Sequence, residues 1–333
     1  MKHPLITIGI LSWNRLHYLQ ATLESARICL QYPNIQWIVS DNESEEPGLR
    51  EYLDRCDWVH QKIFKKQTHA AAMNQIVDMA LGEYLILWPE DVQFTGKGDW
   101  LIDLVELLDR HRFLGSIGLD FQRRCTLHDR FGTPWLNNLG GIYHDFKRMG
   151  LHFRRRQTLT SSRGLKVRTG GWVMPGICGS GIPSLTRTEV WRQLGPWKTT
   201  KSEGANLVDS SLGAEYDMDL RFFKRGKPLQ MGYLVKPVAA DILTDPTGCK
   251  AKVRGNRRYG VYLTPPDGRF YYRIHDMTDI PDPKDDRPIS FMEGVQPLGF
   301  TIPTDASGER LKSSINTSVV FDIATNRPVA ETP

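Results

Sequence analysis

Acidic residues form two clusters in this chain, and the first cluster directly follows a short apolar run. Glu90 and Asp91 come after residues 84–88 (YLILW), which read as a buried strand. Carboxylates at the carboxyl end of such a strand lie where open α/β sheets bind ligands, and they suit a hard divalent cation that holds a diphosphate. The second cluster, residues 215–219 (EYDMD), follows much later. We therefore predict that one cluster binds a metal and that the other supplies a base.

Strand and helix patterns alternate through the first 120 residues, and this alternation predicts how the first cluster is positioned. Apolar runs predict strands near residues 5–11, 35–39, 59–64, 84–88 and 114–119. Apolar residues at spacings of three and four predict helices near residues 16–30, 49–53, 70–81 and 101–108. Asn14 is expected to cap the first helix. The pattern predicts an α/β fold with a mostly parallel sheet covered by helices on both faces.

The second half of the chain has weaker patterns. Residues 120–180 are rich in Gly, Arg and aromatic residues and are expected to be irregular. Residues 186–189 (TRTE) predict a capping box that begins a helix, and a second helix is expected at residues 216–224. A strand is expected near residues 229–238, and the last 50 residues read as an extension that wraps on the domain or lacks order.

Composition places the chain among globular proteins. It has 333 residues, of which 40% are hydrophobic and 24% charged. The apolar run that begins at Leu5 is too short for a signal peptide and no small-residue cleavage site follows it, so we expect none. No apolar stretch is long enough to span a bilayer. The five cysteines are scattered without metal-ligand or disulfide spacing, which favours a reducing compartment. We therefore expect a cytoplasmic protein, with peripheral membrane contact as an option.

Positive charge concentrates in residues 147–168, which contain eight Lys or Arg and no Asp or Glu within a net charge of +5. This segment is interpreted either as a solvated surface or as a surface that attracts an anionic partner, such as a membrane surface or an acidic glycan. The absence of aromatic residues at regular spacing and of any nucleic-acid-binding motif argues against nucleic acid.

Four stretches, taken in order, resemble the GT-A glycosyltransferases of glycosyltransferase family 2 over about residues 5–240. Residues 8–15 (IGILSWNR) are similar to the opening strand and turn of that family, and residues 38–44 (IVSDNES) to its nucleotide-binding turn. Residues 70–91 are similar to the Asn-bearing helix and the strand that delivers the DxD motif. Residues 215–220 (EYDMDL) with Gly226 are similar to its Glu-Asp-x-Asp-Leu helix.

The resemblance implies an inverting transferase that moves a hexosyl or deoxyhexosyl group. The implied donor is a nucleotide diphosphate sugar, with UDP preferred over GDP or dTDP, and the implied acceptor is a hydroxyl of a glycan or lipid-linked molecule. Asp217 is implied as the general base. Donor contacts are implied for Ser12, Asn14, Arg15, Asp41, Asn74, Glu90 and Asp91. Residues 1–118 correspond to the nucleotide-sugar half, 119–245 to the acceptor half and 246–333 to an extension.

The chain departs from the family pattern at positions that concern the metal. Pro89 replaces the first Asp of the DxD motif, so Mn²⁺ or Mg²⁺ would rest on Asp91 with help from Glu90. Many relatives place a His where this chain has Asp241, which could serve as an oxygen ligand, and His275 is a more distant candidate.

The sequence also allows other functions for the chain and structural roles for some of the candidate residues. Tyr216 replaces an acidic residue, so a non-catalytic nucleotide- or glycan-binding protein with a decayed transferase site is one alternative. A sugar nucleotidyltransferase ranks lower, because no Gly-rich basic turn follows the first strand. Asp41 could simply form an Asx turn, and Asn74 and Asp219 could be structural.

Overall fold

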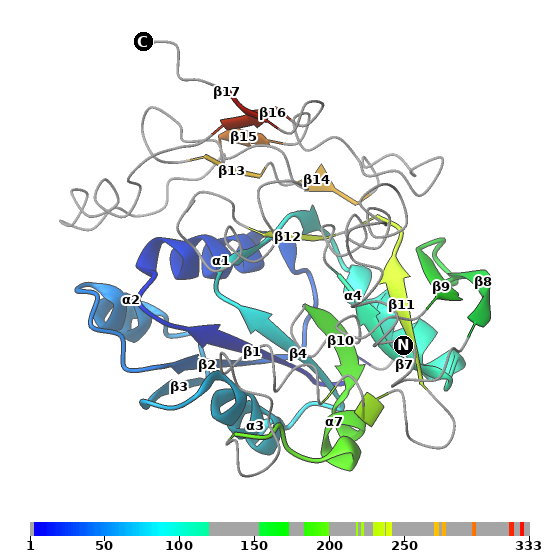
Figure 1. Ribbon diagram of the computed structural model, residues 1–333, viewed down its shortest axis with the longest axis horizontal. Helices are drawn as coiled ribbons and strands as arrows, with labels where there is room; N and C mark the ends of the chain where they lie inside the picture. The colour runs from blue at the N-terminus through cyan, green and yellow to red at the C-terminus, as the bar shows by residue number, and fades with distance from the viewer. Residues whose placement is uncertain are drawn as a thin grey trace.

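A nine-stranded mixed sheet forms the centre of the computed structural model (Figure 1), in the order β3-β2-β1-β4-β10-β7-β11-β9-β8. The structure describes residues 3–119, 153–172, 183–199, 218, 221–222, 229–236, 238–241, 270–272, 275–277, 295–297, 320–322 and 327–329. The sheet strands are β1 (Ile6–Ser12), β2 (Ile35–Asp41), β3 (Gln61–Phe64), β4 (Tyr84–Pro89), β7 (Leu114–Gly118), β8 (Phe153–Thr160), β9 (Lys166–Trp172), β10 (Ser184–Arg187) and β11 (Gln230–Leu234). The helices are α1 (Leu16–Cys29), α2 (Leu49–Arg55), α3 (His69–Met79), α4 (Trp100–Arg110) and α7 (Thr188–Leu194).

Short strands pair outside this sheet. They are β5 (Val92–Phe94) with β12 (Ala239–Asp241), β6 (Gly96–Lys97) with β14 (His275–Asp276), β13 (Phe270–Tyr272) with β15 (Val295–Pro297), and β16 (Val320–Asp322) with β17 (Arg327–Val329). None of the helices in the described ranges is long and apolar enough to cross a membrane.

The predicted α/β fold with a mostly parallel sheet is confirmed. Strands β3, β2, β1 and β4 run parallel in register, and β7 and β11 form a further parallel pair. Strand β10 lies between β4 and β7 and is antiparallel to both, a feature that the sequence patterns did not predict. The prediction of a capping box at residues 186–189 was wrong. Thr186 and Arg187 belong to strand β10, and α7 begins only at Thr188.

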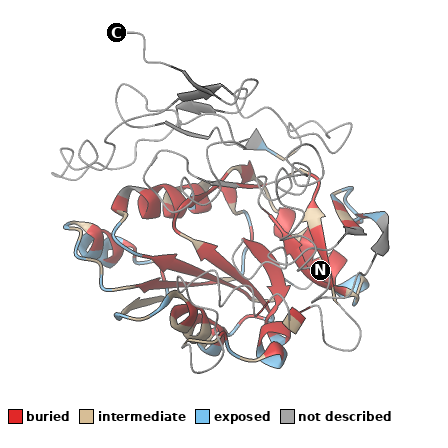
Figure 2. Cartoon of the chain, viewed as in Figure 1, coloured by how far each residue is buried: buried red, intermediate tan, exposed pale blue. Residues whose placement is uncertain are grey.

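Alternation along the strands explains the layers of the core. Ile6, Ile8 and Ile10 of β1 point to a cluster built on α1, α2 and α4, whereas Leu11 points to a second cluster built on α3 and α7. Because successive side chains of a strand face opposite sides, one apolar strand serves both layers. Figure 2 shows that burial concentrates in these strands and in the inward faces of the helices.

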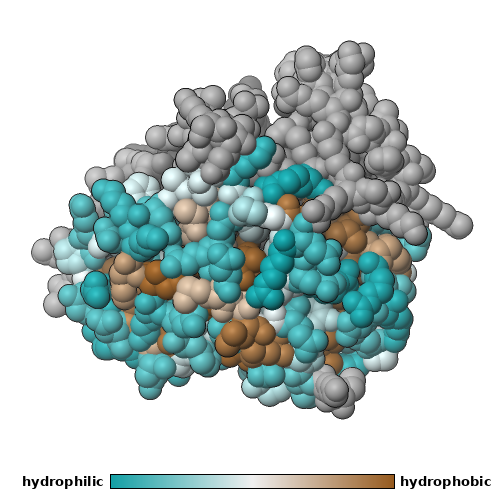
Figure 3. All heavy atoms as spheres, turned by 90° about the horizontal axis from the view of Figure 1, so that it is seen from below, coloured by the Kyte–Doolittle hydropathy of each residue, from teal (hydrophilic) through white to brown (hydrophobic). Residues whose placement is uncertain are grey.

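Helix α3 packs closely on β1 because Gly9 faces it. A Cβ atom added at Gly9 would lie 2.2 Å from Cγ2 of Ile76. Seen from below (Figure 3), the face that carries α3 and α7 is largely hydrophilic, with hydrophobic side chains in separate patches. The helices therefore cover the apolar surface of the sheet on this side.

Three arginines bind the carbonyl groups that helices leave unpaired at their carboxyl ends. Arg187 donates to the Leu108 carbonyl in the last turn of α4 and also to the Leu114 carbonyl of β7. Arg192 donates to the Ala80 carbonyl at the end of α3, and Arg221 to the Leu194 carbonyl at the end of α7 and the Pro196 carbonyl after it. Such contacts satisfy backbone acceptors that would otherwise lack partners. Burial lowers the pKa of Arg187, whose guanidinium is largely enclosed by these carbonyls.

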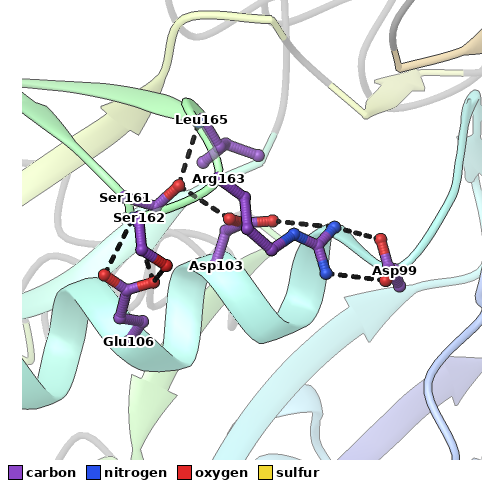
Figure 4. A network of polar contacts seen from close by, with 7 residues as sticks. All are labelled: Asp99, Asp103, Glu106, Ser161, Ser162, Arg163 and Leu165. Carbon is purple, nitrogen blue, oxygen red and sulfur yellow. Dashed lines mark hydrogen bonds and ion pairs between the residues drawn. The ribbon is translucent and has the colours of Figure 1, made fainter.

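A basic hairpin, β8–β9, continues the sheet where the sequence predicted irregular structure. Its turn is anchored on α4 by a polar network (Figure 4). Ser161 Oγ donates to Asp103 Oδ1 at 2.6 Å and accepts from the Leu165 N–H at 2.9 Å, and Arg163 pairs with Asp99 and Asp103. Arg163, one of the residues in the basic segment, is therefore engaged in holding the hairpin. Lys147 and Arg148 lie outside the described residues, and membrane contact by this segment stays a prediction.

Replacing Ser161 by alanine is expected to lower the free energy of unfolding by about 1–3 kcal/mol, because a buried carboxylate and a partly buried N–H lose their shared partner. Urea unfolding followed by circular dichroism measures this loss. The matched control is Ser162→Ala, whose side chain contacts Glu106 at an exposed position and whose removal should cost less than about 0.5 kcal/mol. Equal losses in the two variants would contradict the anchoring role of Ser161.

Candidate active site

The carboxyl ends of β1, β2 and β4 bring six of the seven predicted donor-binding residues, all except Asn74 of α3, to one edge of the sheet. Ser12 is in register with Asp41, and Leu11 with Pro89. The Glu90 N–H donates to the Leu11 carbonyl at 3.1 Å. The acidic pair therefore starts directly beside the end of β1, where an open α/β sheet binds its ligands.

Asp41 organises the turn that follows β2. Its side chain is buried and accepts hydrogen bonds from the Ser44 N–H at 2.8 Å and the Ser44 hydroxyl at 2.6 Å. The bond runs to the N–H three residues on, whereas the Asx turn that the sequence allowed would use the N–H two residues on. Ser12 Oγ is also buried, and it has no hydrogen-bond partner within the described ranges. A nucleotide contact by either residue stays a prediction.

Asn14 joins the two turns at this edge and does not cap α1, contrary to the prediction. It adopts a left-handed backbone conformation with φ of 50°, and its Oδ1 accepts from the N–H groups of Glu45 at 2.7 Å and Glu46 at 3.3 Å. Its own N–H donates to Ser44 Oγ at 2.8 Å. Arg15 occupies the N-cap position of α1 instead. These bonds fix the backbone from which Arg15 projects.

Arg15 contacts both residues of the acidic pair. Its Nε donates to Glu90 Oε1 at 2.8 Å, a second guanidinium nitrogen lies 2.5 Å from that oxygen, and a third lies 3.3 Å from Asp91 Oδ2. The two carboxylate side chains are only 6% and 8% exposed, whereas the Arg15 side chain is 28% exposed. The sequence indicated these residue types but not their contact.

The pKa shifts at this cluster follow from burial and charge. Burial raises the pKa of the Glu90 carboxyl, Arg15 opposes that rise, and the neighbouring Asp91 adds to it. Burial alone lowers the pKa of Arg15, but Glu90 and Asp91 more than reverse this, so the guanidinium stays charged. The cluster therefore brings two carboxylates and one permanent cation together in a largely buried position.

Helix α1 holds the backbone of the acidic turn in place. The Thr22 hydroxyl lies 2.6 Å from the Glu90 carbonyl and 2.9 Å from the Val92 carbonyl. The indole N–H of Trp88 donates to the Val92 carbonyl at 2.7 Å, and the Trp88 ring stacks on Phe94 with centroids 3.5 Å apart. A turn fixed at this many points presents its carboxylates at a defined position.

The backbones of both further metal candidates run beside the segment that follows Asp91. Asp241 is in register with Val92 through the pairing of β12 with β5, and His275 with Gly96 through that of β14 with β6. The side chains of Asp241 and His275 are not among those that the structure describes. Asp217, the predicted base, and Asp219 lie outside the described residues.

The acidic pair fits a hard divalent cation by its donor chemistry. Mg²⁺ and Mn²⁺ prefer carboxylate oxygens, and Mg²⁺ typically takes one or two carboxylates and completes its shell with water and substrate phosphates. Glu90 and Asp91 supply two such groups at adjacent positions. Within the described part of the chain, no group of three or more His, Cys, Asp or Glu side chains gathers to hold a metal.

Asn74 uses its amide for structure. Its Nδ2 donates to the Trp197 carbonyl at 2.9 Å, and its Oδ1 accepts from the Trp197 N–H at 2.7 Å. This pair of bonds ties α3 to the segment after α7. The donor contact that the resemblance implies for Asn74 stays a prediction.

Trp13 was missed by the sequence reasoning. It is 57% exposed, although large aromatic side chains are usually buried, and it lies between Ser12 and Asn14 at the ligand edge. The signal was available: a bulky aromatic residue directly after a buried strand, among polar neighbours. An exposed indole ring here offers a flat surface on which a base can stack.

Comparisons with known proteins place this geometry in context. Residues 7–170 match the family model described as Glycosyl transferase family 2. Among curated proteins, the uncharacterized protein y4gI of Sinorhizobium fredii is 30% identical over 112 residues, which make up 32% of this chain and 12% of that protein.

Two solved structures are similar to the chain at 14% sequence identity. The crystal structure of S. aureus TarS 1-349 matches with a TM-score of 0.43, covering 71% of this chain and 60% of that one. The mannosyltransferase PcManGT from Pyrobaculum calidifontis, in complex with GDP-Man and Mn²⁺, matches with a TM-score of 0.43, covering 73% and 58%. The chain thus spans less than two thirds of the length of each relative named here.

Proposed function

We propose that this chain, which carries a glycosyltransferase family 2 domain in residues 7–170, transfers a sugar from a nucleoside diphosphate sugar to a hydroxyl group of a glycan or lipid-linked acceptor. The observation that carries this proposal is the cluster of Arg15, Glu90 and Asp91 at the same sheet edge as Asp41. The permanently charged Arg15 guanidinium lies beside two carboxylates that could hold a divalent cation. Both positive groups would favour binding of a diphosphate leaving group.

The nucleoside is proposed to bind over the ends of β1 and β2. Asp41 and Ser12 would contact the base or ribose, Asn14 would shape the pocket, and the Trp13 ring would stack on the base. Aromatic side chains stack well on flat ring systems and are enriched where one side stays exposed. The donor preference is UDP, with GDP and dTDP as alternatives.

The diphosphate is proposed to lie at the acidic turn. Asp91 and Glu90 would hold Mn²⁺ or Mg²⁺, with Asp241 as a further oxygen ligand and His275 as an alternative. When bound, such an ion supplies positive charge that offsets the charge developing on the leaving group. Arg15 would bind diphosphate oxygens, because a guanidinium pairs with phosphate in a forked geometry.

The transfer step is proposed to invert the configuration at the anomeric carbon of the sugar. The acceptor oxygen forms a bond to the anomeric carbon from the face opposite the diphosphate, while the bond from that carbon to the diphosphate oxygen breaks. Asp217 takes the proton of the acceptor hydroxyl, and the nucleoside diphosphate leaves with the bonding electrons. The proposal for Asp217 depends on the resemblance of residues 215–220 to the family helix.

A thermal-shift panel of UDP, GDP, dTDP and CMP, each with and without Mn²⁺, tests the donor class. We expect one nucleoside diphosphate to raise the melting temperature, and to raise it more with Mn²⁺, because a ligand that binds only the folded state stabilises it. The absence of any shift with all four nucleotides would count against the proposal and favour a decayed site.

A further inference from the structure

The Arg15 guanidinium binds the two carboxylates that the proposed function assigns to a divalent cation. Two of its nitrogens are within 2.8 Å of Glu90 Oε1, and a third is 3.3 Å from Asp91 Oδ2. A guanidinium and a metal ion compete for such a carboxylate pair, because the guanidinium already uses one oxygen of each carboxylate as an acceptor. The positive charges of a guanidinium and a metal ion that share one carboxylate pair also repel each other.

We propose that Arg15 competes with the divalent cation for Glu90 and Asp91, and that a bound nucleoside diphosphate relieves this competition by taking over the guanidinium. The cation and the nucleotide then bind cooperatively, so the site loads its metal chiefly together with its donor. This inference rests on the proposed function, since the diphosphate is the partner to which Arg15 would turn.

The surroundings of Arg15 permit such an exchange of partners. Its side chain is 28% exposed, so an anion from solvent can approach it, while Glu90 and Asp91 are almost fully buried. The Arg15 guanidinium also lies 5.3 Å from the centre of the Tyr18 ring. The Asn14 bonds hold the Arg15 backbone, so only side-chain torsions need to change.

Charge balance explains why the metal and the nucleotide would be coupled, and thermodynamic linkage makes that coupling reciprocal. Without nucleotide, Arg15 neutralises much of the negative charge that would attract a cation. When a diphosphate binds the guanidinium, the carboxylates regain that charge, and the diphosphate contributes oxygen ligands of its own. If the nucleotide increases the affinity for the metal, the metal must increase the affinity for the nucleotide by the same factor.

Isothermal titration of Mn²⁺ into the wild type and into Arg15→Gln, first alone and then with saturating nucleotide from the panel, tests the competition. We expect Mn²⁺ alone to bind Arg15→Gln at least about tenfold more tightly than the wild type. We also expect the nucleotide to tighten Mn²⁺ binding by about tenfold or more in the wild type and by clearly less in the variant, within the usual range of site coupling. Arg27→Gln, an exposed arginine of the same helix, is the matched control and should behave as the wild type.

Arg15→Gln leaves two buried carboxylates side by side, so its fold is checked by circular dichroism, and Arg15→Lys provides a second variant. Lysine keeps the positive charge but lacks the forked donors of arginine. The Arg15→Lys variant should therefore bind Mn²⁺ more tightly than the wild type. Unchanged Mn²⁺ affinity and unchanged coupling in the folded variants, with nucleotide still bound, would overturn this inference alone. Failure of every nucleotide to bind the wild type would overturn the proposed function together with the coupling.

Discussion

Asp217→Asn is expected to lower the turnover of sugar transfer by roughly 10²–10⁴-fold while leaving donor affinity unchanged. The asparagine keeps the size of the side chain but cannot take the proton of the acceptor hydroxyl. The nucleotide contacts proposed for Ser12, Asp41 and Asp91 stay intact. A loss confined to turnover would therefore mark Asp217 as the base.

Turnover is measured as release of the nucleoside diphosphate, once the panel has identified the nucleotide and an acceptor is known. Asp219→Asn is the matched control, because it removes a carboxylate two residues away at a position for which we expect a structural role. Wild-type turnover in Asp217→Asn would refute the base assignment. Equal losses in both variants would indicate a general disturbance of this segment instead.

Asp91→Asn is expected to weaken Mn²⁺-dependent nucleotide binding by at least about 100-fold. Replacing even an outer-shell partner of a metal ligand typically costs about 10–100-fold in metal affinity, and Asp91 is proposed as the ligand itself. A neutral amide also holds Arg15 less well than a carboxylate does. Isothermal titration of the nucleotide in the presence of Mn²⁺ measures the effect.

Asp99→Asn provides the control for the Asp91 variant. Asp99 is exposed, pairs with Arg163 at the start of α4 and belongs to the hairpin anchor, so its replacement should leave nucleotide affinity unchanged. Nucleotide affinity in Asp91→Asn equal to that of the wild type would remove the acidic turn from the proposed donor site. In that case Asp41 would become the main remaining anchor for the nucleotide.

The fold was largely predictable because its first half is built from local patterns. The apolar run of β4 and the stripe of leucines on α1 each reflect the periodicity of one element, and the strand–helix alternation implies a parallel sheet. Glu90 and Asp91 could be placed at the ligand edge by the same reasoning, since they follow a buried strand. These features depend on residues that are neighbours in the sequence.

The unpredicted features depend on partners that are distant in the sequence. Strand β10 is short and gains its bonds from β4 and β7, and its last two residues, Thr186 and Arg187, formed the first half of the predicted capping box. Asn14 could have capped α1, but the N–H groups of the turn after β2 captured its side chain. The pairing of Arg15 with Glu90 spans 75 residues of sequence, and no local pattern signals it.

The pairing of β5 with β12 has a consequence for the order in which the molecule is assembled. Val92 directly follows the acidic turn, yet its strand partner, Asp241, is synthesised much later. Until β12 arrives, the nascent chain presents β5 as an open edge beside two carboxylates, and closing this long loop is entropically costly and slow. Truncated forms that end before residue 239 should therefore expose a strand edge that is prone to intermolecular pairing. A shortened chain that keeps the acidic turn would therefore need to retain β12 as well.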